Sequence, residues 1–136
     1  MNADPIRVHP RSSVAALLVG VIATLQYHSA QILSAFDRFF GDRGDARGFV
    51  YFLEHWYQAL QGKASLLNPG IFYPTRHTLA YSDLLFGFAA PYSFFRALGF
   101  SMFTSTELVI ILLTFVSYCV AFWLLYRMLR FDLLPS

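Results

Sequence analysis

The sequence is poor in charge. Aspartate, glutamate, lysine and arginine make up 13% of its 136 residues, whereas an ordinary soluble domain carries about 25%. This shortage argues against a water-soluble globule, and the 57% share of hydrophobic residues argues against an intrinsically disordered chain. The net charge of +2 is too small for a nucleic-acid-binding surface, so we expect no nucleic-acid partner.

Cysteine is almost absent as well. The lone Cys119 cannot form a disulfide within the chain. The sequence also lacks zinc-binding Cys/His spacings, the HExxH motif of metalloproteases, the GxSxG nucleophile elbow and the phosphate-binding glycine loop. These absences exclude the enzymes that such motifs define, and we predict no metal-binding cluster.

Long apolar runs are what the sequence has instead. Residues 14–36 and 108–126 carry no formal charge, and residues 84–106 carry a single one, Arg96. Each run is long enough to cross a hydrocarbon core of roughly 30 Å. We therefore predict an all-α integral membrane fold with three transmembrane helices, at residues 14–36, 84–103 and 106–128.

The first run has an alternative interpretation. Arg7 and Arg11 precede it, as positive residues precede the apolar part of a secretory signal peptide. However, the uncharged run continues to Phe36, and no A-x-A cleavage pattern follows the apolar part. These observations favour an uncleaved membrane helix.

The remaining segments are polar. Residues 1–13 form a short N-terminus and residues 129–136 a short tail, while the loop 37–83 holds ten of the 18 charged residues. Within the loop an amphipathic helix is predicted at residues 46–61, with Asp45 as N-cap and Gly62 just past its end. Phe49, Phe52, Leu53, Trp56 and Leu60 share one face of that helix, which suits it to lie at the membrane interface.

The second and third predicted spans resemble a helical hairpin. Gly99, Phe100 and Ser101 interrupt the apolar pattern between them. Ser105 or Thr106 is the expected cap of the following helix, and this places Glu107 in its first turn. Arg96 is expected to extend toward a lipid headgroup.

The sequence does not decide the orientation in the membrane. With three spans, Arg7, Arg11 and Arg96 lie on the side of the N-terminus, and the other seven basic residues lie on the opposite side. Read simply, that count places the long loop in the cytoplasm. The five acidic residues of the loop and the two arginines before the first span weaken this conclusion.

Acidic residues mark both ends of the loop. Asp42 and Asp45 follow the first predicted span, and Asp83 directly precedes the second. Such carboxylates can bind a cation, or one can act as a general base; the structural alternative is helix capping and salt bridges. Because both loop ends return to one membrane face, we expect the three to share a polar notch, with Tyr81, His55 and His77 as further candidates.

An ordered set of short segments resembles a known family. Gly44-Asp45 follows the first span, and then come EHWYQALQG at 54–62, NPGIFYP at 68–74 and TLAYSD at 78–83. Over roughly residues 17–136 the chain resembles the N-terminal part of the GT-C class of integral membrane glycosyltransferases. The similar branch consists of bacterial proteins that use polyprenyl-phosphate sugars.

The resemblance implies a location and a chemistry. The loop 37–83 would lie outside the cytoplasm and the N-terminal residues 1–13 inside it, on a multi-pass protein of the bacterial inner membrane, and a lipid-linked sugar would be the donor. Asp45 would be the catalytic base, with Asp42 as the competing choice, and Arg47 and Arg76 would balance the phosphate charge. The sugar, the acceptor and any need for a divalent cation are left open.

The chain departs from that class in its number of spans. It stops about where a fourth span is expected, so we expect residues 1–136 to be a fragment that is inactive alone and is completed by further transmembrane segments or a subunit. The alternative is a small non-enzymatic three-span membrane protein that acts in assembly or partner binding. A transporter fragment is a third class, but it calls for charges inside spans, where only Arg96 qualifies.

Overall fold

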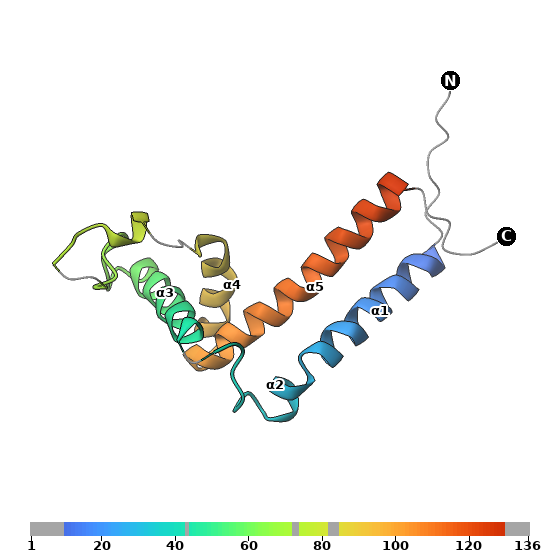
Figure 1. Ribbon diagram of the computed structural model, residues 1–136, viewed down its shortest axis with the longest axis horizontal. Coiled ribbons are helices and arrows are strands. Elements are labelled where there is room, and N and C mark those ends of the chain that lie inside the picture. Colours follow the sequence, from blue (N-terminus) through green and yellow to red (C-terminus); the bar gives the residue numbers. More distant parts are fainter. Residues whose placement is uncertain (1–9, 43, 72–73, 82–84, 130–136) are drawn as a thin grey trace, which may run out of the picture. The chain divides into compact units, whose positions relative to one another are not determined.

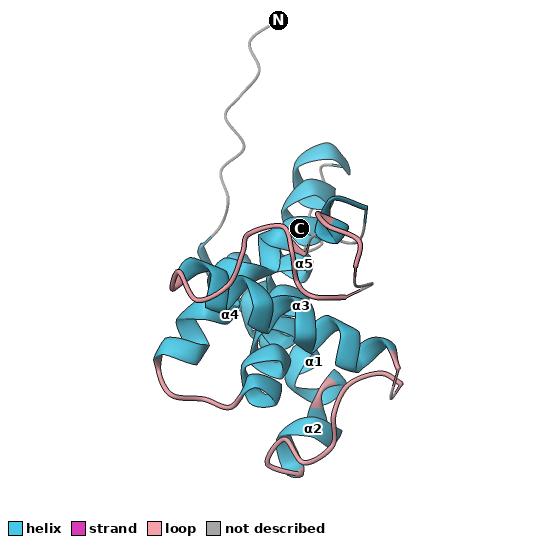
Figure 2. Ribbon diagram, turned by 90° about the vertical axis from the view of Figure 1, so that its left-hand side faces the viewer, coloured by secondary structure: helices cyan, strands magenta, loops and turns pink. Residues whose placement is uncertain are grey.

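The computed structural model describes residues 10–42, 44–71, 74–81 and 85–129. Throughout these residues the regular structure is helical, as Figure 2 shows, and the predicted all-α fold is confirmed. The chain divides into two compact units. The first comprises Met1–Ser29 with Ile111–Ser136, and the second comprises Ala30–Ile110.

Two helices form the first unit. Helix α1 (Pro10–Tyr27) begins with a proline, which suits the first helical position because its missing N–H would have no partner there. Helix α5 (Met102–Leu129) contributes its C-terminal part. In Figure 1 the two helices run side by side in opposite directions. Two contacts fix this pairing: the Tyr118 hydroxyl donates to the Ala16 carbonyl at 3.0 Å, and His28 Nε2 lies 3.0 Å from Thr114 Oγ1.

Helix α5 is the strongest membrane signal in the described part of the chain. Its residues Met102–Met128 are long and apolar enough to cross a membrane, whereas the apolar part of α1, Val14–Tyr27, is shorter. Only 6% of its most apolar window is buried within the chain, whereas the core helix of a water-soluble domain is mostly buried. The other two predicted spans stay predictions.

The segment predicted as the first span contains two helices. Helix α1 stops at Tyr27, and the short helix α2 covers Ser29–Leu33. Helix α2 then ends in a Schellman turn, in which the Phe36 N–H donates to the Gln31 carbonyl at 2.9 Å. The position that glycine usually occupies in this turn is Ala35, with φ of +52°. No glycine therefore marks this helix end in the sequence.

Helix α3 (Asp45–Leu60) lies in the second unit and confirms the predicted loop helix to within one residue at each end. Gly62 adopts the predicted left-handed conformation, with φ of +71°. It allows the Lys63 N–H to donate to the Gln58 carbonyl at 2.9 Å and so completes a Schellman motif.

The apolar face of α3 packs within the second unit. It faces helix α4 (Phe86–Ala97) and the single-turn helix η1 (Thr78–Tyr81). Trp56 meets Phe86 edge-to-face with centroids 5.2 Å apart, and Leu79 of η1 is fully buried in the same cluster. Leu60, which was expected on this face, is 61% exposed. Packing against α4 therefore occupies most of the surface that the sequence assigned to the membrane interface.

Helix α4 is shorter than the span predicted at residues 84–103. It contains 12 residues, which extend about 18 Å along the axis. A third Schellman turn ends it, with Gly99 at φ of +93° and the Phe100 N–H donating to the Phe95 carbonyl at 3.4 Å. The break expected at Gly99 is thus confirmed.

The start of α5 differs from the expected one. Ser101 is the cap, since its hydroxyl accepts the Thr104 N–H at 3.1 Å, and the prediction of Ser105 or Thr106 is wrong. The helix consequently begins four residues before the predicted 106, and Glu107 lies in its second turn, where it is fully buried. The prediction chose Ser105 or Thr106 because these hydroxyl residues lie nearer the apolar run than Ser101 does.

Candidate functional site

The acidic pair lies at the amino end of α3. Asp42 Oδ1 accepts two backbone hydrogen bonds, from Gly44 at 2.7 Å and from Asp45 at 2.8 Å. The prediction of Asp45 as N-cap is wrong, because Gly44 is the N-cap residue, without a side-chain cap, and Asp45 is the first residue of the helix. Asp42 instead accepts the N–H groups of these two residues from outside the helix. Both acidic residues are exposed. The loop thus presents two neighbouring carboxylates to the surroundings, one of them oriented by the backbone.

The two arginines assigned to phosphate binding are also exposed. Arg47 follows Asp45 by two positions on the first turn of α3. Arg76 lies in the segment before η1, beside His77. The backbone of His77 is held by Asn68, whose Oδ1 accepts the His77 N–H at 2.5 Å.

The histidine on α3 is separated from the acidic pair. His55 follows Asp45 by ten positions on the same helix, which corresponds to about 15 Å along its axis. His55 is buried, unlike Asp42 and Asp45. The structure therefore does not bring His55 into one notch with the acidic pair. Asp83 lies outside the described residues, as does the side chain of Tyr81.

A cleft of about 380 Å³ opens between α3 and the loop that follows it. Its polar lining comes from Tyr51, Glu54, His55, Gln58, Ser65 and Asn68. Several of these groups already bind protein atoms, because the Tyr51 hydroxyl donates to the Pro69 carbonyl and His55 Nε2 lies 3.5 Å from the Leu66 carbonyl. Asn68 also bonds within the loop. The cleft therefore contributes mainly to attaching the loop to α3.

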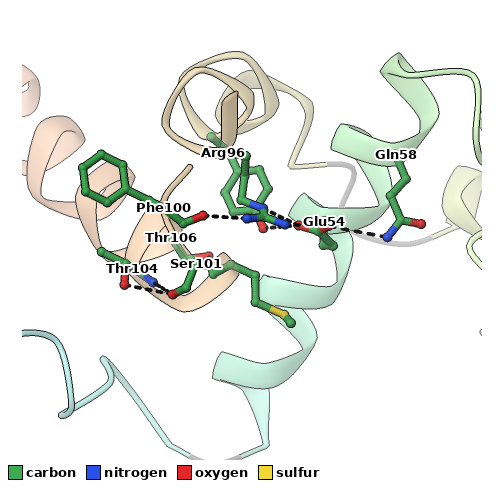
Figure 3. A network of polar contacts seen from close by, with 9 residues as sticks. Glu54, Gln58, Arg96, Phe100, Ser101, Thr104 and Thr106 are labelled. Carbon is green, nitrogen blue, oxygen red and sulfur yellow. Dashed lines mark hydrogen bonds and ion pairs between the residues drawn. The ribbon is translucent and has the colours of Figure 1, made fainter. Parts of the chain in front are cut away.

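A polar network joins α3 to α4, and Figure 3 shows it at close range. Arg96 donates from Nε to Glu54 Oε2 at 2.9 Å, and the Tyr92 hydroxyl donates to the same oxygen at 2.6 Å. Arg96 also donates to the Phe100 carbonyl at 2.5 Å and lies over the Tyr57 ring, 5.2 Å from its centroid. One carboxylate thus organises the packing of two helices.

The environment of Glu54 favours its charged form. Partial burial by itself raises the pKa of Glu54, but the hydrogen bonds from Arg96 and Tyr92 and the Arg96 charge outweigh burial. They hold the pKa below its ordinary value of 4.5. Glu54 is therefore a structural anion in this unit.

Sequence reasoning missed this network. It placed Arg96 at a lipid headgroup, and this expectation is wrong because the guanidinium binds Glu54. One signal was available: a lone charge in an apolar run usually needs a partner of opposite sign.

A second carboxyl is buried at the start of α5. Glu107 Oε1 accepts the Phe40 N–H at 2.5 Å, while Oε2 has no hydrogen-bond partner in the described part of the chain. Phe39 packs edge-to-face on Phe103 beside it, with ring centroids 5.5 Å apart. Glu107 therefore anchors the loop that leads to the acidic pair.

No group of three or more metal-ligating side chains occurs among the residues that the structure describes. Comparison with protein-family models, with curated proteins and with solved structures finds no match to this chain.

Proposed function

We propose that this chain is part of an integral membrane glycosyltransferase of the GT-C class. In this proposal the protein moves a sugar from a lipid-linked donor to an acceptor at the outer face of the bacterial inner membrane. The observation that carries the proposal is the exposed acidic pair at the amino end of an amphipathic loop helix. Asp42 accepts two backbone N–H groups there, and the Asp45 carboxylate is exposed beside it.

The arrangement of the pair suits general base catalysis. A base must reach the acceptor hydroxyl within hydrogen-bond distance, so it needs an accessible carboxylate on a rigid element. Asp45 has that position, because it opens a helix of 16 residues whose inner face is packed. Asp42 holds the helix end through the Asp45 N–H. Asp45 is therefore the preferred base, and Asp42 orients it.

The donor would be held by charge and by the bilayer. Transfer from a polyprenyl-phosphate sugar leaves a phosphate, whose negative charge a nearby guanidinium stabilises. Arg47 is exposed on the same helix turn as Asp45, and Arg76 is a second exposed arginine of the loop. The apolar helix α5 supports insertion into the membrane in which such a donor is dissolved.

Photo-crosslinking tests this proposal on the chain itself. The probe is a radiolabelled polyprenyl phosphate with a photoactivatable isoprene unit, added to membranes that contain the chain. We expect specific labelling, reduced at least fivefold in the Arg47→Gln/Arg76→Gln variant. Lys63→Gln is the matched control, because Lys63 is another exposed basic residue of the same loop, and it should label like the unaltered chain.

Two results would overturn the proposal. Equal labelling of the double arginine variant and the Lys63→Gln control would show that the arginines do not hold the phosphate. Equal labelling by a photoactivatable phosphatidylglycerol would show general lipid contact, as expected of a non-enzymatic membrane protein.

A further inference from the structure

We propose that the chain crosses the bilayer twice, through α1 and the C-terminal part of α5, so that both termini lie in the cytoplasm. The occupant of the outer surface of this helix pair is the hydrocarbon of the lipid bilayer. The inference rests on the membrane insertion in the proposed function and is independent of any sugar chemistry.

The direction of the two helices carries the argument. In a chain with three successive spans, the first and the third run parallel. Helices α1 and α5 instead run antiparallel within one unit, as Figure 1 shows. Along α1 the contacts pass from Ala16 to His28, while along α5 they pass back from Tyr118 to Thr114. If α1 and α5 both cross the membrane, an even number of crossings follows.

The helix lengths agree with this count. Helix α1 has 18 residues, which extend about 27 Å, and its apolar part, Val14–Tyr27, accounts for about 21 Å of this length. The part of α5 in the first unit, from Ile111 to Leu129, is about as long as the whole of α1, so α1 with its polar first turn and this part of α5 approach the roughly 30 Å of a hydrocarbon core. Helix α4 has 12 residues, about 18 Å, and is too short to cross. Its Arg96 and Tyr92 are bound to α3 by way of Glu54.

The distribution of polar groups in the pair is the reverse of that in a soluble protein. Thr24 and His28 are buried, with 6% and 1% exposure, and His28 contacts Thr114. Large apolar side chains point outward instead, including Leu18 at 58% and Ile22 at 63%. The same holds along α5, where the exposed apolar residues are Leu112, Val116, Val120, Trp123, Leu124, Leu125 and Met128. Such a surface is stable against hydrocarbon and unstable against water.

The two-crossing topology also changes the charge count. In the sequence Arg7 precedes α1 and Arg11 belongs to its first turn, while Arg127 belongs to the last turn of α5 and Arg130 follows it, so four of the ten basic residues flank the outer ends of the two helices. The other six belong to residues 30–101, and segments longer than about 60 residues contribute little to orientation. The positive-inside rule therefore places the termini in the cytoplasm. The segment with α3 and α4 joins the opposite ends of the two spans and lies outside.

Cysteine labelling with a membrane-impermeant maleimide tests this topology. Three single-cysteine variants in a Cys119→Ser background carry the thiol before Met1, at Lys63→Cys, and after Ser136. We expect the Lys63→Cys variant to be labelled in intact cells. Both terminal cysteines should be labelled at least tenfold more after permeabilisation, while the chain resists extraction with alkaline carbonate.

If the C-terminal cysteine and Lys63→Cys were labelled in intact cells and the N-terminal cysteine were not, the number of crossings would be odd and the proposal would be overturned. Labelling of all three on one side would exclude the crossings, and protection of Lys63→Cys in intact cells would overturn the orientation. If the predicted pattern is found and the polyprenyl phosphate probe fails to label the chain, the sugar-transfer proposal fails and the topology stands.

Discussion

Arg96 and Glu54 are 42 positions apart in the sequence, and their Nε and Oε2 atoms form an ion pair at 2.9 Å. Their side chains are 23% and 19% exposed, so water screens the pair only in part. The pair fixes α4 against α3. It also stabilises the packing of α4, a 12-residue helix rich in aromatic residues, against α3.

Removing the guanidinium should loosen this unit. We expect Arg96→Gln to lower the free energy of unfolding by about 1–2 kcal/mol, because charge-assisted hydrogen bonds are lost and Glu54 keeps only weaker partners. The measurement is urea unfolding in mild detergent, followed by the fluorescence of Trp56 in a Trp123→Phe background. Arg47→Gln is the control, since Arg47 is exposed on the same helix pair. Equal midpoints for the two variants would contradict the structural role of Arg96.

The same carboxylate predicts a dependence of stability on pH. Because the folded-state pKa of Glu54 is lowered, its contribution to stability is complete above its ordinary pKa of 4.5 and is lost as the pH falls through the lowered value. We expect unfolding midpoints of the unaltered chain to fall below pH 4.5 more steeply than those of Glu54→Gln. If the unfolding midpoints of the two proteins depended on pH in the same way, protonation of Glu54 would not affect stability.

Gly20 allows the close approach of α1 and α5. A Cβ atom at this position would collide with the Tyr118 ring, whereas one at Gly87 of α4 would meet open space. We therefore expect Gly20→Ala to destabilise the helix pair by about 1–3 kcal/mol and Gly87→Ala to be neutral or slightly stabilising. Hydrogen exchange of the α1 amides in detergent micelles measures the difference. Unchanged protection in Gly20→Ala would contradict the observed pairing.

The sequence predicted α3 well because two independent signals agree there. Apolar residues recur at helical spacing from Phe49 to Trp56, and Gly62 marks the end. The sequence overestimated the length of α4, because the apolar composition continues through Leu98 and Phe100 after the helix ends. Run length alone does not distinguish hydrocarbon-facing residues from those that pack on a neighbouring helix. The turn that ends α2 has Ala35 in the left-handed position, so the sequence carries no glycine there to mark it.

Only those features of the site that depend on residues close together in the sequence could be predicted. The sequence placed a helix start at Asp45, and in the structure Gly44 is the N-cap residue while Asp42 accepts the N–H groups of Gly44 and Asp45. The link between Glu54 and Arg96 depends on how two helices pack, which residue spacing does not contain. The convergence expected of His55 with the acidic pair failed because a rigid helix separates them.

Sugar transfer by the Asp45→Asn variant shows whether Asp45 is the catalytic base of a glycosyltransferase. It is measured with a radiolabelled polyprenyl-phosphate sugar in membranes of cells that express the complete reading frame. Asparagine keeps the size of the side chain and removes the base, so we predict a loss of at least about 100-fold, with unchanged membrane insertion. Asp37→Asn, at another exposed acid of the same loop, should retain full activity. Full transfer by Asp45→Asn would exclude Asp45 as the base, and full transfer by Asp42→Asn as well would reduce the acidic pair to a helix cap.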